Sequence, residues 1–521
     1  MKLQKSLNTY ATLMTSLSSM LGSGWLFSSF LAVQLAGPLS IIAWPIGGLL
    51  VTFIALCFSE LSSSLPITGS IARYGQISHG PIVGFIISWL AWISCVAVAP
   101  TEVQATLMYF SNFISGLSYV KNGLLVLTLK GQYAAIILLF AFTIINYYGI
   151  EFISKLNNAF ALWKICIPVL TSLILVSTSH NFSNLNVSTI EHATHGLFEA
   201  ISTVVIFSYL GFKESTEFGE EIQNPQTSIP IAVIGSVFFA VVFYMFIQFV
   251  FIISIPTQWI EQGWHNITIN GLAPFSSLAM SLGLAYLAKL IIVDAAITPF
   301  SAVLIYTATT GRITYAMSKN RYIPNVFSKL NTFGIPFNAI MLNFFMGCLL
   351  FYPLPNWQIL LKFQSIAMIL AYIIGPVTLT TIRKTTPKLD RPFKLPFNSL
   401  IPIITCFVCT VIIYWSGYET IKLLNIAILI GVVIFVTLEN ISSHNVISFA
   451  CLKQSVWIIL HILGIQTIAY FGDFSPINHL IHYPYDYISL FLLSIISFAL
   501  SQVWYKDMNI INQEIDIIMN N

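Results

Sequence analysis

Long apolar runs return along the whole chain and constrain its fold more than any other feature. Runs of about 18 to 25 apolar residues match a helix that crosses a lipid bilayer. Of the 521 residues, 57% are hydrophobic and only 8% are charged. A soluble domain carries about a quarter of its residues as charged ones. The sequence therefore predicts an all-α integral membrane protein, and its few scattered charges indicate no nucleic acid partner.

The apolar runs divide into about fourteen predicted transmembrane helices. The separations of the eleventh from the twelfth and of the thirteenth from the fourteenth are the least distinct, so twelve or thirteen spans stay open. The predicted spans are 9–33, 39–62, 82–112, 132–150, 157–178, 196–218, 229–255, 278–306, 337–353, 358–382, 399–417, 421–438, 450–472 and 485–505.

The distribution of basic residues predicts the orientation in the membrane. With the N-terminus in the cytoplasm, sixteen Lys and Arg residues fall in inside connections and only Lys121, Lys130 and Lys422 fall outside. Positive charge favours the cytoplasmic side. We therefore expect a multi-pass protein of the cytoplasmic membrane with both termini inside. No hydrophilic stretch exceeds about 20 residues, too few for a separate soluble domain.

Two predicted spans are interrupted near their middle. The stretch "SSMLGSGWLF" places Gly22, Ser23 and Gly24 together halfway along span one. In span six, "ISTVVIFSYLGFKESTEFGEEIQNPQTSIP", the apolar half ends at Leu210-Gly211 and a more polar turn follows. Two interrupted spans at matching positions of two halves indicate a secondary transporter built from inverted repeats. The alternative is that the first triplet is a close helix-packing patch.

An unwound helix inside the membrane suits a zwitterionic ligand. Its free backbone groups are tolerated only where they line a cavity. The N-terminus of a half-helix favours a carboxylate, and free carbonyls favour an ammonium group. A pair of broken helices can therefore bind a zwitterion without charged side chains.

Several motifs, in order along the predicted topology, resemble one known family. Over roughly its first 440 residues the chain resembles the amino acid–polyamine–organocation permeases, and its "SGWLF" and fourteen spans are most similar to the bacterial aspartate/glutamate branch. The motifs are Gly22-Ser23-Gly24; Glu60, Pro66, Gly69, Tyr74 and Gly80; Phe207, Tyr209, Gly211, Phe212, Glu220, Glu221, Asn224, Pro225 and Pro230; "GRITYAMSKNRYIP"; and "RKTTPKLDRPFKLP".

This resemblance implies a LeuT-like 5+5 inverted-repeat core with discontinuous helices 1 and 6 and with peripheral C-terminal helices. The implied divisions are a ten-helix transport core at 1–382, with repeats at about 9–178 and 196–382, four peripheral spans at 398–505 and a short cytoplasmic tail at 506–521.

The resemblance also implies substrate contacts at the two breaks. The backbone and hydroxyl at Ser23 and Gly24 would hold the substrate carboxylate. The backbone carbonyls of Met20, Phe207 and Leu210 would hold its amino group. The Phe207 ring would gate the site, although a core aromatic is the alternative there. The expected substrate-binding residues are Ser19, Met20, Gly22, Ser23, Gly24, Cys95, Phe207, Ser208, Leu210 and Gly211.

Lys213 departs from the family pattern, because many relatives carry an acid just after the Gly-Phe of span six. A cation here favours an anionic substrate side chain, which makes Lys213 a selectivity candidate. The alternative is a lysine that snorkels to the cytoplasmic surface.

Ionisable residues deep in predicted spans are coupling candidates, because a charge at the bilayer centre costs about 2.5 to 3.5 kcal/mol and such residues usually face a pathway. The resemblance places Lys164 where sodium-coupled relatives bind a cation, which suggests proton coupling; the alternative is a structural lysine that bonds carbonyls of span one. Asp294 is expected to relay a proton or to pair with a lysine. Glu102 is a further relay candidate, and Glu60 is expected in a cytoplasmic-side ion pair.

Other functions lack their sequence signatures. The chain has no phosphate-binding loop and no convergent metal-ligand motif of a membrane enzyme, and its seven cysteines lack metal-ligand spacing. We therefore expect no enzyme, metal or cofactor, and no repeated selectivity loop indicates a channel. The prediction is an amino acid permease that couples uptake to protons. An exchanger, a polyamine or cationic amino acid permease, and a non-transporting amino acid sensor stay open, as does the oligomeric state.

Overall fold

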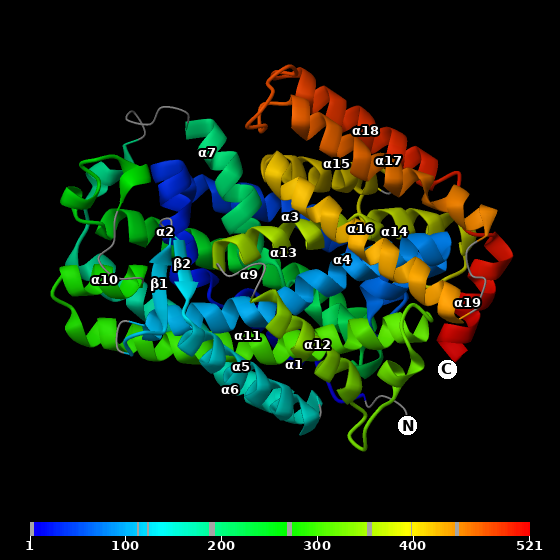
Figure 1. Ribbon diagram of the computed structural model, residues 1–521, viewed down its shortest axis with the longest axis horizontal. Coiled ribbons are helices and arrows are strands. Elements are labelled where there is room, and N and C mark those ends of the chain that lie inside the picture. The colour runs from blue at the N-terminus through cyan, green and yellow to red at the C-terminus, as the bar shows by residue number, and fades with distance from the viewer. Residues whose placement is uncertain are drawn as a thin grey trace.

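The computed structural model describes residues 5–111, 114–121, 124–148, 150–186, 193–267, 273–351, 357–397, 399–442 and 448–520. These residues form a helical bundle (Figure 1). Within the described part of the chain, the one sheet is an antiparallel hairpin of β1 (Ser118–Lys121) and β2 (Leu124–Leu127), in which Ser118 lies opposite Leu127. The prediction of an all-α protein is therefore confirmed.

Each predicted span contains at least one α-helix. The helices are α1 (Thr9–Met20), α2 (Gly24–Ala36), α3 (Ser40–Ser64), α4 (Ser70–Phe110), α5 (Leu129–Ile145), α6 (Ile150–Thr178), α7 (Ala193–Ala200), α8 (Ile206–Tyr209), α9 (Pro225–Ser254), α10 (Pro274–Ser281), α11 (Ala285–Lys319), α12 (Phe337–Leu350), α13 (Trp357–Tyr372), α14 (Ile374–Thr385), α15 (Leu400–Trp415), α16 (Tyr418–Ser442), α17 (Phe449–Phe471), α18 (Tyr485–Ser501) and α19 (Met508–Asn520).

The lengths and apolar character of these helices fit a multi-pass membrane protein. Nine helical segments among the described residues are long and apolar enough to cross a membrane, and α12, α15 and α18 are shorter apolar helices. Gly417, at φ +84°, separates α15 from α16. The fourteen crossings and the 5+5 arrangement stay predictions.

Both predicted interruptions are present. Span one is divided into α1 and α2, and Leu21 between them leaves the helical conformation at φ −95° and ψ 69°. Span six runs through α7, a π-helical turn at Ile201–Val205 and α8, after which Leu210 is extended. Short 3₁₀ turns at Glu214–Glu217 and Gly219–Glu221 complete it. Residues 21–23 and 210–213 are referred to below as the two breaks.

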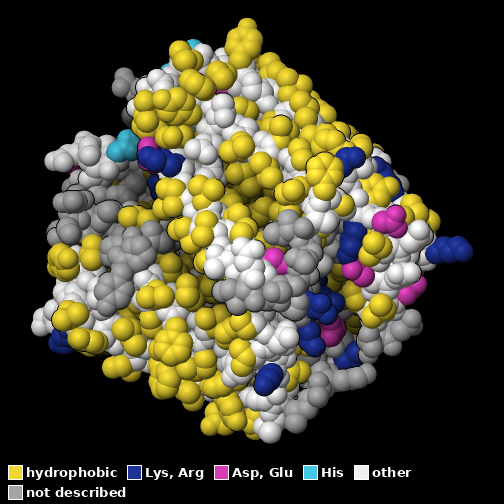
Figure 2. All heavy atoms as spheres, turned by 45° about the vertical axis from the view of Figure 1, so that its right-hand side comes forward, with side chains coloured by type: hydrophobic (Ala, Val, Ile, Leu, Met, Phe, Trp, Pro, Cys, Tyr) yellow, Lys and Arg dark blue, Asp and Glu magenta, His cyan; other side chains and the backbone are white. Residues whose placement is uncertain are grey.

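The centre of the bundle is formed by long buried helices. α4 packs along α11 and α13, and α9 packs along α1 and α3. The C-terminal helices α15, α17 and α18 contact one another and lie at one side of the bundle (Figure 1). Many basic and acidic side chains gather toward the end where both termini lie, beside a broad hydrophobic surface (Figure 2). The charge distribution predicts that this end faces the cytoplasm.

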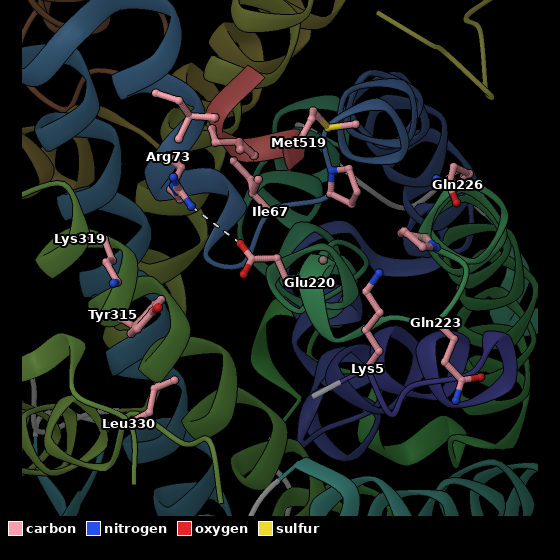
Figure 3. Close-up of a pocket in the computed structure, with 15 residues that line it drawn as sticks. Lys5, Ile67, Arg73, Glu220, Gln223, Gln226, Tyr315, Lys319, Leu330 and Met519 are labelled. Carbon is pink, nitrogen blue, oxygen red and sulfur yellow. Dashed lines mark ion pairs between the residues drawn. The ribbon is translucent and has the colours of Figure 1, made fainter. Parts of the chain in front are cut away.

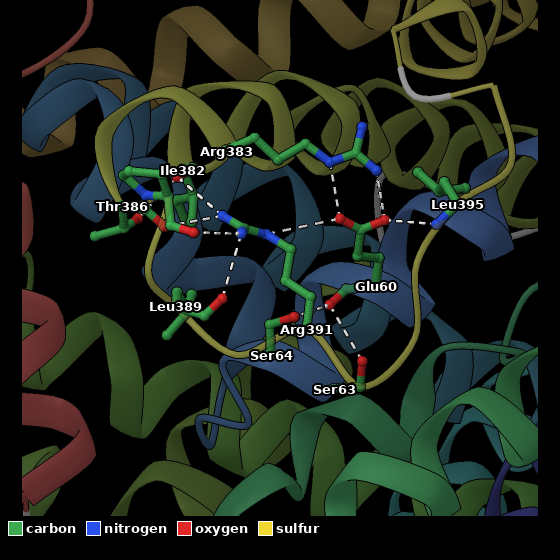
Figure 4. A network of polar contacts seen from close by, with 10 residues as sticks. Glu60, Ser63, Ser64, Ile382, Arg383, Thr386, Leu389, Arg391 and Leu395 are labelled. Carbon is green, nitrogen blue, oxygen red and sulfur yellow. Dashed lines mark hydrogen bonds and ion pairs between the residues drawn. The ribbon is translucent and has the colours of Figure 1, made fainter.

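A polar network at the end of α3 joins it to α14 and to the loop that follows (Figure 4). The carboxylate of the buried Glu60 accepts hydrogen bonds from Nε of Arg383 at 2.8 Å and from the backbone N–H of Leu395 at 2.7 Å. Nε of Arg391 lies 3.9 Å away and completes the network. The expected ion pair of Glu60 is confirmed.

Most of the predicted C-terminal tail forms helix α19, whose apolar side is buried at Ile511 and Ile515. Nζ of Lys506 pairs with Glu514 at 2.5 Å, and the backbone N–H of Lys506 bonds to the carbonyl of Ser78. The tail is thus docked against the end of the bundle that carries the termini.

Candidate functional site

The second break lies directly against the last turns of α1, just before the first break. Gly211 has φ +105°, and a Cβ there would lie 2.7 Å from the backbone carbon of Ser19 at the end of α1. Next to it, the hydroxyl of Ser16 donates to the carbonyl of Phe212 at 2.8 Å. A residue without a side chain at 211 therefore allows the unwound part of span six to touch the end of α1.

A small cavity lies between the breaks. Six of the predicted binding residues line it, together with Val98, Glu102 and Tyr306. Its free volume is about 10 Å³, which is room for about one water molecule. An amino acid is much larger, so binding requires the breaks to move apart. The six predicted residues are Ser19, Met20, Gly22, Gly24, Phe207 and Leu210.

The carboxylate of Glu102 occupies the N-terminus of α2. It accepts a hydrogen bond from the backbone N–H of Ser23 at 2.7 Å and one from the Ser23 hydroxyl at 3.1 Å. These are the donors that the resemblance assigns to a substrate carboxylate. Gly22 permits the approach, because a Cβ there would lie 2.5 Å from Oε1 of Glu102. The site therefore already binds one carboxylate, supplied by α4.

One of the predicted carbonyls for an amino group is already hydrogen-bonded to a side chain. The hydroxyl of Tyr244, on α9, donates to the carbonyl of Met20 at 2.7 Å. The carbonyl of Phe207 accepts from the backbone N–H of Leu210 at 3.1 Å. Tyr244 was not predicted from the sequence, because the sequence of an apolar span does not show which carbonyl a tyrosine hydroxyl will contact.

The deep lysine and the deep aspartate surround the first break. Nζ of the fully buried Lys164, on α6, donates to the carbonyl of Ser18 at 2.7 Å. Asp294, on α11, accepts from the indole N–H groups of Trp25 and Trp163, at 3.0 and 2.7 Å. Lys164 also interacts electrostatically with both Glu102 and Asp294. The structure thus brings all three coupling candidates together.

Phe207 lines the cavity and packs against a second ring outside its lining. Phe207 is 7% exposed and meets Trp357 edge-to-face, with ring centroids 5.9 Å apart. Trp357 in turn packs on Phe27 at 4.8 Å. The expected gate stays a prediction, and Trp357 is a neighbour that the sequence pattern did not indicate.

Four of the ten predicted residues do not line this cavity: Ser23 and Gly211, which belong to the breaks themselves, and Cys95 and Ser208. Cys95 lines a neighbouring small cavity that shares Tyr306 with the first. Ser208 lies against Gly24, where its hydroxyl donates to the carbonyl of Val204 and bonds to Ser28. Both lie one layer behind the predicted contact surface, because each faces a neighbouring element instead of the gap between the breaks.

Lys213 is fully buried, so the alternative that it snorkels to the surface is wrong. Its Nζ lies 2.6 Å from Glu217 and 3.6 Å from Glu214. It is absent from the lining of the central cavity described above. Its cationic head thus interacts with protein carboxylates.

An open cleft of about 740 Å³ lies at the end of the bundle where the termini lie (Figure 3). Arg73 on α4 and Glu220 after the second break face each other across it, with Nη1 and Oε1 3.8 Å apart. Tyr315 and Lys319 of α11 and Met519 of α19 line other parts. Along the chain, the polar turn at Glu214–Glu217 lies between Leu210, which lines the central cavity, and Glu220, which lines this cleft.

Comparisons with known proteins agree with this architecture. A family model for amino acid permeases matches residues 7–451. The chain is 33% identical over 511 residues to a glutamate/serine transporter of Bacillus subtilis (AimA), covering 96% of this chain and 93% of that protein. It is 31% identical over 509 residues to an aspartate-proton symporter of Bacillus subtilis, covering 96% of both chains. A methylthioribose transporter of Bacillus subtilis is 25% identical over 425 residues, covering 79% of this chain and 88% of that protein.

Proposed function

The chain belongs to the amino acid permease family, and from this premise we propose that it imports acidic amino acids together with protons across the cytoplasmic membrane. One observation carries the proposal: the carboxylate of Glu102 accepts hydrogen bonds from the backbone N–H and the hydroxyl of Ser23. A backbone site that already holds a carboxylate suits the carboxylate of an amino acid. The chain is a transporter and not an enzyme.

The names of two relatives support the substrate class and the coupling ion. One relative is named a glutamate/serine transporter and the other an aspartate-proton symporter, and each matches this chain over nearly its whole length. These names favour acidic over cationic substrates. Exchange and sensing without transport are the alternatives that the experiment below separates.

We propose that substrate and Glu102 compete for the same donors. An ionised Glu102 holds Ser23 and excludes the substrate carboxylate. Protonation of Glu102 weakens these hydrogen bonds, since those to charged groups are the strong ones. The substrate carboxylate then replaces Glu102 at the N-terminus of α2. Binding of a proton and binding of a substrate thereby favour each other.

Lys164 and Asp294 complete this proposed coupling site. Lys164 holds the carbonyl of Ser18 at the end of α1, so a change in its charge alters the break itself. Asp294 holds Trp25 of α2 on the other side of the break. In this arrangement the protonation of three side chains controls the relative position of α1 and α2.

The other predicted contacts are proposed with the same roles. Phe207 closes the cavity as a gate, and the carbonyls of Met20 and Leu210 receive the amino group after Tyr244 moves aside. Lys213 lies behind the cavity and favours an anionic side chain through its field instead of by contact. We further propose the two inverted five-helix repeats, with α15–α18 peripheral and both termini in the cytoplasm.

Uptake into proteoliposomes tests the proposed function. An inward pH gradient is expected to drive accumulation of labelled glutamate or aspartate, and an excess of unlabelled acidic amino acid is expected to suppress it. Labelled lysine and putrescine are expected to remain outside. Binding without uptake would identify a sensor, and uptake that requires internal amino acid but no pH gradient would identify an exchanger.

The competition at Ser23 predicts that Glu102→Gln removes the pH dependence of binding. In the wild-type protein, apparent affinity for glutamate is expected to fall as the pH rises, by up to about tenfold per unit above the titration of Glu102. The amide side chain of the variant cannot ionise, so its affinity is expected to stay high and constant. Binding by the purified protein across a pH series measures this.

The exposed Glu419, on α16, provides the matched control: Glu419→Gln is expected to keep the wild-type pH profile. A Glu102→Gln protein whose affinity still falls with pH would show that Glu102 does not compete with the substrate.

A further inference from the structure

A second buried group of charges begins with the last residue of the second break and continues into the turn that follows it. It consists of Lys213, Glu214 and Glu217, all of which are fully buried. Nζ of Lys213 lies 2.6 Å from Oε1 of Glu217 and 3.6 Å from Oε1 of Glu214. We refer to these three residues as the inner charge cluster.

The two carboxyl groups of this cluster differ in their partners. Glu217 accepts from Lys213 and, at 3.1 Å, from the hydroxyl of Ser70 on α4. Within the described part of the chain, neither oxygen of Glu214 has a hydrogen-bond partner. Thr309 on α11 lies beside Glu214, but its hydroxyl donates to the carbonyl of Tyr306 at 3.2 Å. Glu214 is therefore the less stabilised of the two.

The neighbouring cations are already neutralised by other carboxylates. Arg312, fully buried on α11, binds Glu221 through two hydrogen bonds of 3.0 Å. Arg73 pairs with Glu220 at the cleft. The inner charge cluster is thus left with two carboxyl groups and one lysine.

Among the residues that the structure describes, the remaining titratable groups around the cluster bring no positive charge. They come from three elements: Cys95 and Tyr74 from α4, Tyr306 from α11 and Tyr372 from α13. A surplus ionised carboxylate that is buried without a partner is strongly unfavourable. One further positive charge is needed here, and a proton is the smallest that can supply it.

We propose that Glu214 binds a proton and that the coupling proton passes through this carboxyl between the central cavity and the cytoplasmic cleft. This proposal rests on the proposed proton-coupled transport and adds a site to it. Tyr306 lines the central cavity and interacts electrostatically with both Glu102 and Glu214. Glu220, six residues beyond Glu214, lines the cleft. Glu214 thus lies on the chain segment between the two spaces.

The step is a simple acid dissociation. The O–H bond of the Glu214 carboxylic acid breaks, the proton passes to water in the cleft, and the carboxylate keeps the electron pair. The ionised Glu214 then competes with Glu217 for the ammonium of Lys213. Because Glu217 also bonds to Ser70, this competition loosens span six from α4. Proton release and opening toward the cytoplasm are thereby linked.

The experiment compares Glu214→Gln with the wild type in proteoliposomes. With a pH gradient of about one unit, one coupled proton supports about tenfold accumulation. Glu214→Gln is expected to lose this accumulation but to retain exchange of internal for external glutamate, which needs no net proton movement. Glu261→Gln, in the exposed loop after α9, is the control and is expected to accumulate normally. Normal accumulation by Glu214→Gln would overturn the proposal.

Infrared difference spectra of the purified proteins give a readout that does not depend on transport. The wild type and Glu261→Gln are expected to show the carbonyl band of a buried carboxylic acid that Glu214→Gln lacks. An unchanged band in Glu214→Gln would refute the proton on Glu214, even if that variant transports nothing. If the wild type shows the band but transports nothing, the proposal of proton-coupled transport is refuted, while the proposal that Glu214 carries a proton is supported. Replacing sodium with choline is expected to leave wild-type accumulation unchanged. Loss of that accumulation would show that sodium, and not a proton, supplies the further positive charge.

Discussion

Replacing Gly211 with alanine is expected to abolish glutamate accumulation while the protein still folds. Gly211 has φ +105°, a conformation that costs a residue with a Cβ about 1 to 3 kcal/mol. The added Cβ would also lie 2.7 Å from both the backbone carbon and the Cβ of Ser19. The second break would have to move away from the end of α1, and the cavity next to both would lose its shape.

Gly263→Ala provides the matched control for this substitution. Gly263 has a similar φ of +90°, but no atom of the described residues lies within 4 Å of a Cβ built there. The control introduces the same backbone strain without a steric clash. It is therefore expected to be slightly less stable than the wild type and to transport normally. Uptake and thermal unfolding of both variants measure the difference. Normal uptake by Gly211→Ala would show that close contact of the second break with the end of α1 is not needed for transport.

Replacing Glu60 with glutamine is expected to lower the free energy of unfolding by about 3 to 5 kcal/mol, the cost of removing one partner from a buried ion pair. Glu60 is 1% exposed and Arg383 only 14%. Two guanidinium groups, those of Arg383 and Arg391, lose their shared carboxylate, and the backbone N–H of Leu395 loses a charged acceptor. The junction of α3 with α14 is expected to open first.

The exposed pair of Lys422 and Glu419 is the control, with side chains 50% and 60% exposed. Glu419→Gln is expected to change the free energy of unfolding by less than about 1 kcal/mol. Denaturation of both variants in the same detergent compares the two effects. Equal losses for Glu60→Gln and Glu419→Gln would show that the Glu60 network does not hold α3 to α14.

The residues of the breaks themselves could be predicted from the sequence. Gly22, Gly24 and Gly211 interrupt apolar spans, and an interrupted span must place its free backbone groups at a cavity. Six of the ten predicted binding residues accordingly line the cavity. The ion pair of Glu60 could also be predicted, although not its partners, because a carboxylate at the end of an apolar helix needs a nearby cation.

Residues that approach the breaks from other helices could not be placed in this way. Tyr244 lies within the predicted span 229–255, and Trp357 lies directly before the predicted span 358–382. Neither position shows in the sequence which side chain faces the breaks. For the same reason, Cys95 and Ser208 were wrongly expected to line the cavity. Both lie near the site but face other neighbours. The two carboxyl groups beside Lys213 could be recognised as a candidate proton site only after the structure showed that they are buried.

The sequence alone determined that this chain is a helical membrane protein and where its helices unwind, because hydrophobic length and helix interruption are local properties of the chain. Only the tertiary structure decided that Glu102 binds Ser23, that Lys164 binds the carbonyl of Ser18, and that Glu214 has no hydrogen-bond partner among the described residues. Each of these depends on which faces of distant helices meet. That choice follows from packing the whole bundle, and no short stretch of sequence contains it.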